Sequence, residues 1–175
     1  MASDDIVLVP YDPAWPGLFA EEAARLRGVL HPVRVIGIEH FGSTAVPGLV
    51  AKPIIDILIA VPSLAYAKIA FVVPIKALGY IYWEDNPATD RMFFVKGMPP
   101  HGERRTHHVH ITEPDGEMWQ LRLAFRDHLR AHPDEAARYA ALKRELAQRH
   151  AMDREAYTAA KSDYVEAVHR DMALA

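Results

Sequence analysis

The feature that most constrains the fold is the run IIDILIAV, residues 54–61, in which Asp56 is the only polar side chain. Five of its eight residues are β-branched, and the run is far shorter than a membrane-spanning helix. Such a run is typical of a strand covered on both faces, which occurs mainly where helices pack against a sheet. Segment 33–41 is also largely apolar and β-branched. We therefore expect both segments to be central strands of one sheet.

Patterns typical of strands and helices continue on both sides of these segments. In chain order we expect an apolar strand at 6–9, a turn at 11–16, a helix at about 18–29, a helix from Ser63 to about Leu78 that Gly79 ends, strands at 80–83, 91–96 and 105–112, and helices after Met118 that are broken near Pro133 and Ala151.

The length of 175 residues fits a single domain, sheet-rich over 1–117 and helical over 118–175. Half of the residues are hydrophobic and a quarter are charged, so the chain can bury a core and is not globally disordered. We predict an α/β or α+β fold, with a mixed central sheet of about five strands and C-terminal helices packed on it.

Composition excludes several classes of function. Twenty basic against 23 acidic residues give a net charge of −3, so no dedicated nucleic-acid binding is expected. The chain has no cysteine, which excludes disulfides, thiolate zinc sites and cysteine nucleophiles. Acids stand where a signal peptide needs basic residues, and no apolar run approaches the ~18 residues of a membrane span. We expect a cytoplasmic protein with no membrane association.

The segment that ends in Gly42-Ser43 is a candidate phosphate-binding turn. A strand that ends in Gly-Ser leaves backbone N–H groups and a hydroxyl available to an anion, and glycine permits close approach. The following residues, STAV, are able to begin a short helix whose amino end would strengthen the site. An isolated Gly-Ser is more often an ordinary turn, so the interpretation depends on the polar residues around it.

Asp56 and the strand RTHHVHIT, residues 105–112, supply candidate metal ligands. An unpaired carboxylate within an apolar strand is unfavourable, so Asp56 is expected to be hydrogen-bonded, paired or metal-bound. Strand alternation places His108 and His110 on one face, where two imidazoles are able to chelate one metal or to act as acid and base. Exposed strand histidines are the alternative interpretation.

The C-terminal helices carry basic and aromatic residues on common faces. Arg122, Arg126 and Arg130 are spaced four apart, and we interpret Arg122 and Arg130 as solvated. Arg126 is the candidate for a bidentate phosphate contact. The pairs at 139 and 143 and at 157 and 161 each join a tyrosine to a lysine, and we interpret them mainly as packing residues.

Gly42-Ser43, followed after twelve residues by Asp56, resembles the signature of the polymerase-β-like nucleotidyltransferases. In that superfamily Gly-Ser binds triphosphate and two acids separated by one residue hold divalent metal, but here Leu58 occupies the second acid's position. The whole chain resembles the GrpB family, a group placed in that superfamily and sometimes fused to dephospho-CoA kinase. The matching segments are PYDPAW (10–15), HFGSTAVPGL (40–49), KPIIDI (52–57), THHVH (106–110) and FRDHLR (125–130), with Tyr139 and Lys143.

The resemblance implies a nucleotidyltransferase-like fold in which Gly42 and Ser43 hold nucleotide phosphates. It implies that Lys52 and Arg126 stabilise phosphate charge, and that the histidine strand replaces the superfamily's third acid.

Three functions stay open. They are metal-dependent nucleotidyl transfer, non-catalytic binding of a nucleotide or CoA-like molecule, and metal-dependent phosphoester hydrolysis built on Asp56, His108 and His110. Mg²⁺ prefers oxygen ligands, so an aspartate with histidines suits Mn²⁺, Zn²⁺ or Ni²⁺ better.

Overall fold

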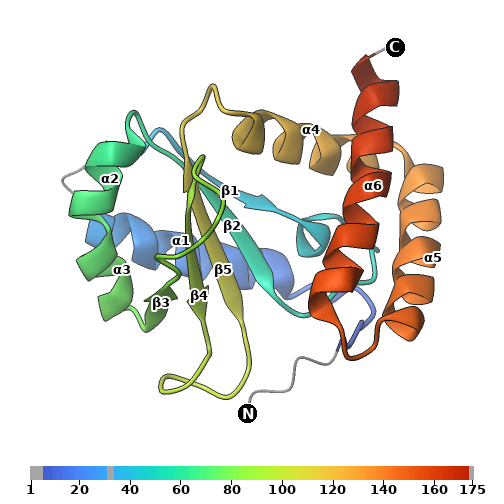
Figure 1. Cartoon of the computed structure of the whole chain (residues 1–175), viewed down its shortest axis with the longest axis horizontal. Coiled ribbons are helices and arrows are strands. Elements are labelled where there is room, and N and C mark those ends of the chain that lie inside the picture. Colours follow the sequence, from blue (N-terminus) through green and yellow to red (C-terminus); the bar gives the residue numbers. More distant parts are fainter. Residues whose placement is uncertain (1–5, 31–33, 174–175) are drawn as a thin grey trace.

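The computed structural model describes residues 6–30 and 34–173, and its centre is a mixed sheet of five strands in the order β1-β2-β5-β4-β3 (Figure 1). The strands are β1 (Gly37–Phe41), β2 (Ile55–Ala60), β3 (Tyr80–Tyr82), β4 (Met92–Lys96) and β5 (His107–Thr112). Only β2 and β5 pair in parallel, and the other neighbours are antiparallel. The predicted mixed sheet of about five strands is confirmed.

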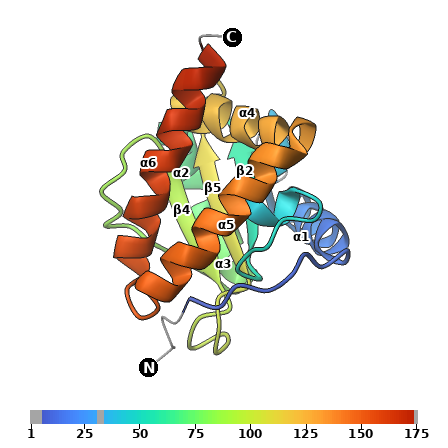
Figure 2. The same cartoon turned by 90° about the vertical axis from the view of Figure 1, so that its right-hand side faces the viewer.

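Six α-helices and one short 3-10 helix surround the described part of the sheet. They are α1 (Trp15–Leu30), the 3-10 helix η1 (Ser43–Ala45), α2 (Leu64–Ala70), α3 (Val72–Ala77), α4 (Glu117–Ala131), α5 (Pro133–Arg149) and α6 (Arg154–Ala173). Figure 2 shows α4, α5 and α6 together on one side of the molecule. None of the helices within 6–30 and 34–173 is both long and apolar enough to cross a membrane.

The alternation of side chains along β2 divides the protein into two layers. Ile55, Ile57 and Ile59 point toward α1, α2 and α3, where they join the main hydrophobic core. Leu58 lies on the opposite face and packs against Phe41 and Met118, the latter from α4. Because residues two apart on a strand share a face, Asp56 also belongs to the side that α4, α5 and α6 cover.

The last two helices pack mainly on the chain that follows β1 rather than on the sheet itself. Val46, Leu49 and Val50 from this segment form a second core with Tyr139 of α5 and Val165 of α6. This arrangement holds α5 and α6 beside the polar face of the sheet without filling the space in front of Asp56.

Three expectations from the sequence are corrected. Segment 33–41 contains β1, but β1 is an edge strand rather than a central one, and Val33 lies outside the described residues. The expected strand at 6–9 is only an isolated bridge between Val9 and Ala51. The helix from Ser63 to Leu78 is two helices, because Pro74 has no N–H to bond to the preceding turn and is tolerated only in the first turn of α3.

Candidate functional site

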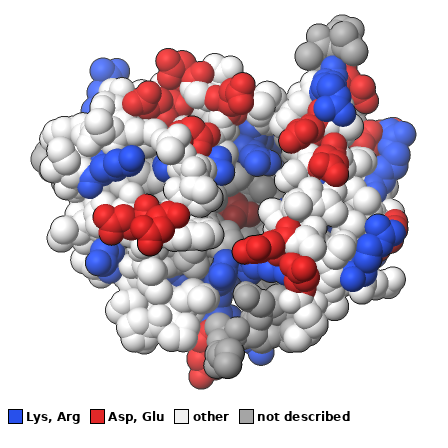
Figure 3. Space-filling view, in the orientation of Figure 1, with Lys and Arg blue, Asp and Glu red and all other residues white. Residues whose placement is uncertain are grey.

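A cleft of about 710 Å³ lies between the polar face of the sheet and the C-terminal helices. In Figure 3 it is the central hollow, and basic side chains are visible inside it. Its walls include every residue that the sequence nominated: Gly42, Ser43, Lys52, Asp56, His108, His110 and Arg126. The neighbouring strands β1, β2 and β5 thus bring Gly42, Asp56, His108 and His110 to one cleft with Lys52, as strand alternation and the superfamily resemblance predict.

Gly42 joins β1 to η1 and allows the turn to approach Asp56. Its φ of 73° lies in the left-handed region that favours glycine, and a methyl group on its Cα would collide with Oδ2 of Asp56. Ser43 follows as the first residue of η1. The turn therefore requires glycine at this position, because any larger residue would meet the Asp56 carboxylate.

Asp56, His108 and His110 form a cluster because β2 and β5 are parallel neighbours. The register pairs Asp56 with His108, and Nδ1 of His108 lies 3.0 Å from Oδ1 of Asp56. Each of the three residues offers one possible ligand atom, and these atoms all lie within 4.8 Å of one another. A carboxylate and two imidazoles at this separation suit a single transition-metal ion.

The protonation states of the cluster favour metal ligation. Burial raises the pKa of Asp56, but the hydrogen bond and charge of His108 outweigh burial, and the pKa of the carboxyl lies below its ordinary value. Burial lowers the pKa of His110 to about 3, although the Asp56 charge opposes this shift. At neutral pH the cluster therefore holds an ionised carboxylate beside a neutral imidazole, which are the forms that bind metal.

Two imidazole nitrogens of the cluster lack hydrogen-bond partners among the described residues. They are Nε2 of His108 and Nδ1 of His110, and both are buried. Because Asp56 is ionised, Nδ1 of His108 carries the proton that the carboxylate accepts, and Nε2 presents a lone pair when the ring is neutral. Buried polar atoms without a partner are unfavourable, so a ligand or ion at this position would satisfy both.

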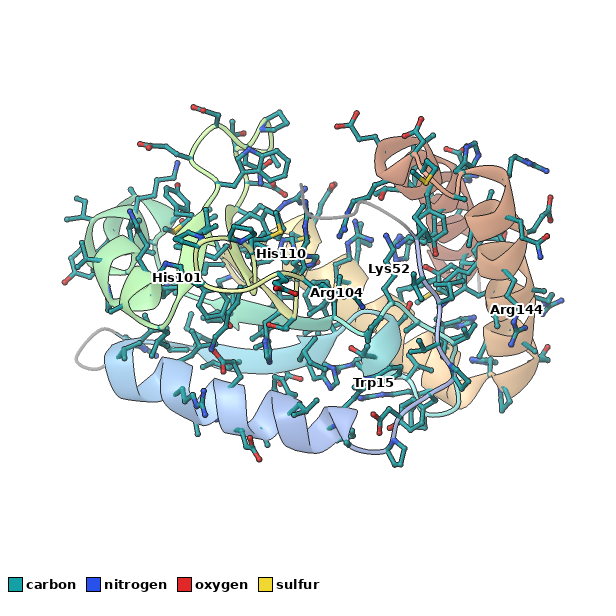
Figure 4. All side chains as sticks on the ribbon, turned by 90° about the horizontal axis from the view of Figure 1, so that it is seen from below. Trp15, Lys52, His101, Arg104, His110 and Arg144 are labelled. Carbon is teal, nitrogen blue, oxygen red and sulfur yellow. The ribbon has the colours of Figure 1, made fainter. Side chains whose placement is uncertain are left out.

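Lys52 lies in the wall of the cleft, as the sequence predicted. Its Nζ sits 4.6 Å from the ring centroid of Tyr157, and that of Lys161 is 5.6 Å from the same ring. Burial, together with the charges of Arg154 and Lys161, lowers the pKa of Lys52 to about 7. Figure 4 labels Lys52 and His110, which lie between the sheet and the C-terminal helices.

Lys143 is a site residue that sequence reasoning assigned mainly to packing. Its side chain is 1% exposed, and Nζ donates hydrogen bonds to the carbonyl of Val50 and, at 3.0 Å, to Oγ of Ser43. Burial lowers its pKa to about 6. Tyr139, one turn earlier on α5, lines the cleft beside it. Two features of the sequence could have indicated that Tyr139 and Lys143 belong to the site: they share a helix face, and both match the GrpB resemblance.

The three arginines of α4 have different partners. The guanidinium of Arg126 donates to Asp127, Glu39 and the carbonyl of His40, so its donors are engaged within the protein. Its role as a phosphate contact stays a prediction. Arg130 is exposed and pairs with Asp127, as the interpretation of a solvated residue implies, and it also donates to the carbonyl of Ala45 in the turn after β1. Arg122 lines the cleft and makes no hydrogen bond or ion pair with any residue that the structure describes.

Basic side chains greatly outnumber acidic ones in the lining of the cleft. Its described lining residues include eight basic side chains: Lys52, Arg91, Arg105, Arg122, Arg126, Lys143, Arg154 and Lys161. The acids among the same lining residues are Asp56 and Glu155. The protein carries a net negative charge overall, so this concentration of basic groups is local to the cleft.

These observations define a mixed α/β protein with a basic cleft on the polar face of its sheet. Comparison with protein families gives the narrower assignment, because the model described as "GrpB protein" matches residues 5–171. The chain belongs to the GrpB family.

Similar proteins support this assignment, and the chain spans a different share of each of them. The chain is 53% identical over 94% of its length to a UPF0157 protein of Pseudomonas aeruginosa and spans 66% of that protein. It is 32% identical to the glutamate-rich protein GrpB of Alkalihalophilus pseudofirmus, over 96% of both chains. It spans 46% of a dephospho-CoA kinase of Mycolicibacterium paratuberculosis, with 34% identity over 97% of this chain.

A solved structure has the same fold. The crystal structure of conserved protein GrpB from Enterococcus faecalis superimposes with a TM-score of 0.83, at 36% sequence identity. The similarity covers 94% of this chain and 96% of the other. Sheet and C-terminal helices are thus common to both proteins.

Proposed function

We propose that the cleft binds the phosphate groups of a nucleotide or a CoA-like molecule. The observation that carries this proposal is the excess of basic side chains in the lining, which has eight, five of them arginines, against two acidic ones. In a partly enclosed cleft, such a surplus attracts a multiply charged anion much more strongly than scattered surface charges would. The Gly42-Ser43 turn contributes backbone donors and a hydroxyl at the same place.

The lowered lysine pKa values support an anion as the occupant. Lys52 and Lys161 flank Tyr157, and each has a pKa below its ordinary value, with burial as the largest cause. A phosphate group between these ammonium groups and Arg122 would offset their repulsion and their lost hydration. Ligand binding would therefore raise the pKa of Lys52 from about 7 and draw a proton from solution.

A single divalent metal fits beside the phosphates. Asp56, His108 and His110 would hold it, and the two imidazole nitrogens without partners are the atoms that it would satisfy. The donor set favours Mn²⁺ or Zn²⁺ over Mg²⁺, because Mg²⁺ takes mainly oxygen ligands. When bound, the ion would neutralise phosphate charge as a Lewis acid. The protein's own residues then hold the phosphates, with Asp56 orienting His108.

The superfamily resemblance favours nucleotidyl transfer as the reaction. Leu58 favours binding without catalysis. Leu58 is 0% exposed and takes the place of a second acid, so the candidate metal cluster has one carboxylate where that reaction uses at least two. A non-catalytic binding module is therefore the second candidate. The dephospho-CoA kinase relative supports a CoA-like molecule as one of the ligands to test.

Titration calorimetry tests the proposal with ATP, dephospho-CoA and inorganic tripolyphosphate, each with Mn²⁺ or with a chelator. At least one of these should bind, and Lys161→Met should weaken it roughly ten- to a hundred-fold, the value of a hydrogen bond to a charged phosphate. Lys76→Met, an exposed lysine on α3, is the matched control and should bind as the parent does. If the parent binds none of the three ligands, the proposal is wrong.

The chelator and the products separate the candidate functions. Loss of binding on chelation places a metal in the site, whereas unchanged binding favours the non-catalytic module. Release of pyrophosphate together with an adenylylated product supports nucleotidyl transfer. AMP with pyrophosphate, or ADP with inorganic phosphate, supports hydrolysis.

A further inference from the structure

Trp83, directly after β3, differs from the other two tryptophans in its exposure. Its side chain is 51% exposed, whereas Trp15 is 3% exposed and Trp119 is half-buried. Trp83 also lines the cleft that holds Asp56 and His110. A large indole open to solvent within a cleft has an apolar face that a ligand is able to cover.

The backbone holds Trp83 in a fixed position. Its N–H donates to the carbonyl of Phe93 at 2.9 Å, which extends the pairing of β3 with β4 by one residue. The ring of Phe93 supports the indole, with centroids 5.7 Å apart and planes tilted by 52°. One side of the indole is therefore occupied by protein, and the indole is positioned before any ligand arrives.

A row of rings leads from Trp83 to the proposed metal cluster. The Phe93 ring stacks on His110 with centroids 4.5 Å apart, and it meets His108 edge-on at 5.2 Å. His110 in turn contacts Phe41, the residue before Gly42, at 5.5 Å. Trp83 and the proposed metal cluster thus lie in the same cleft and are joined by a continuous row of ring contacts.

We propose that Trp83 is the stacking platform for the base of a nucleotide whose phosphates lie among the basic side chains. This inference rests on the proposed function, since it assigns the other end of the same ligand. Stacking on an aromatic side chain accepts any base, because every base has a π-face, and is worth ~1–3 kcal/mol per base. Arg91, in the same wall, has a buried Nε without a partner among the described residues, which is available to the base or sugar.

Two probes that differ in the base test this inference. ATP carries a base and tripolyphosphate does not, so Trp83→Leu should weaken ATP binding roughly five- to 150-fold and leave tripolyphosphate binding within about twofold. Trp83→Phe keeps a ring and should retain most of the ATP affinity. Tyr66→Leu removes a similarly exposed aromatic ring, 58% exposed on α2 outside the cleft, and should change neither affinity. Circular dichroism verifies that each variant is folded.

Tryptophan fluorescence gives a second measurement. ATP should quench the emission of the parent protein, tripolyphosphate should not, and Trp83→Leu should abolish the quenching. If Trp83→Leu binds ATP as tightly as the parent, the stacking assignment is overturned while phosphate binding stands. If the parent binds tripolyphosphate but gains nothing from the base of ATP, the assignment is likewise overturned. If it binds neither probe, the stacking assignment is overturned, and the proposed function falls with it if dephospho-CoA does not bind either.

Discussion

The buried amine of Lys143 makes the free energy of unfolding depend on pH in one direction. Burial, followed by the charges of Lys161 and Arg144, lowers its pKa from 10.5 to about 6. Between these values the unfolded chain holds a proton at this amine that the folded chain has released. The free energy of unfolding therefore rises with pH through this window. Below about pH 6 the Lys143 amine is protonated in both the folded and the unfolded chain. Burial of its charge then lowers the free energy of unfolding by the full amount.

The size of the effect follows from the same linkage. Inside the window each pH unit adds about 1.4 kcal/mol to the free energy of unfolding, so the step from pH 7 to pH 9 adds about 2.7 kcal/mol. Lys143→Met removes this contribution. Lys52 and Lys161 have lowered pKa values and act in the same direction, but they remain in both proteins and cancel in the comparison.

Urea unfolding at pH 7, 8 and 9 measures the effect in the parent, Lys143→Met and Lys76→Met. The difference between the parent and Lys143→Met should change by about 2.7 kcal/mol over this range, and Lys76→Met should follow the parent. The absolute stability of Lys143→Met is not the test, because the substitution also leaves the Val50 carbonyl without its donor. Parallel pH profiles for the parent and Lys143→Met would refute the reasoning.

Three further substitutions test the site, and a fourth, Gly48→Ala, serves as a control. Asp56→Asn should abolish the binding of one Mn²⁺ or Zn²⁺ per chain in calorimetry, and two tight metal sites in the parent would contradict the single-metal assignment. Gly42→Ala should lower the free energy of unfolding by more than the ~1–2 kcal/mol of left-handed strain, because of its collision with Asp56. Gly48→Ala, with φ 78° and no atom within 4 Å of the added carbon, should show the strain alone, and equal losses would exclude the collision. Arg126→Ala should lower the free energy of unfolding by about 1–3 kcal/mol, because it removes hydrogen bonds to charged groups, and a variant as stable as the parent would show that these bonds contribute nothing.

The sheet half of the site was predictable because strand geometry is regular. Alternation alone places Asp56 opposite the isoleucines of β2 and puts His108 and His110 on one face of β5, and the parallel register brings the two faces together. The edge position of β1 was not predictable in the same way. Its Ile38 and Phe41 are buried by helices above and below, so an apolar pattern does not reveal how many strands flank it.

The helical half of the site depends on packing that no local pattern encodes. A lysine on a helix normally lies in solvent, and the four-residue spacing of Tyr139 and Lys143 fits an ordinary surface face as well. Lys143 is buried because α5 packs against Val46, Leu49 and Val50, whose segment supplies the carbonyl that the amine bonds. The partner of the lysine is 93 residues away in sequence, so only the folded structure reveals it.

Leu58 explains why basic side chains and a single metal belong together in the proposed site. It pairs in register with His110 and packs against Phe41 and Met118, so the sheet position of the second acid is filled by core. Two divalent ions would bring four positive charges to a cleft that already has a basic surplus, with Asp56 as the one acid in the cluster. A single ion avoids that repulsion, because Lys52, Lys161 and the arginines would stabilise the remaining phosphate charge. In two-metal sites the second metal stabilises negative charge on the phosphates. In the proposed site, side chains of the C-terminal helices and of the segment before β2 would do this instead.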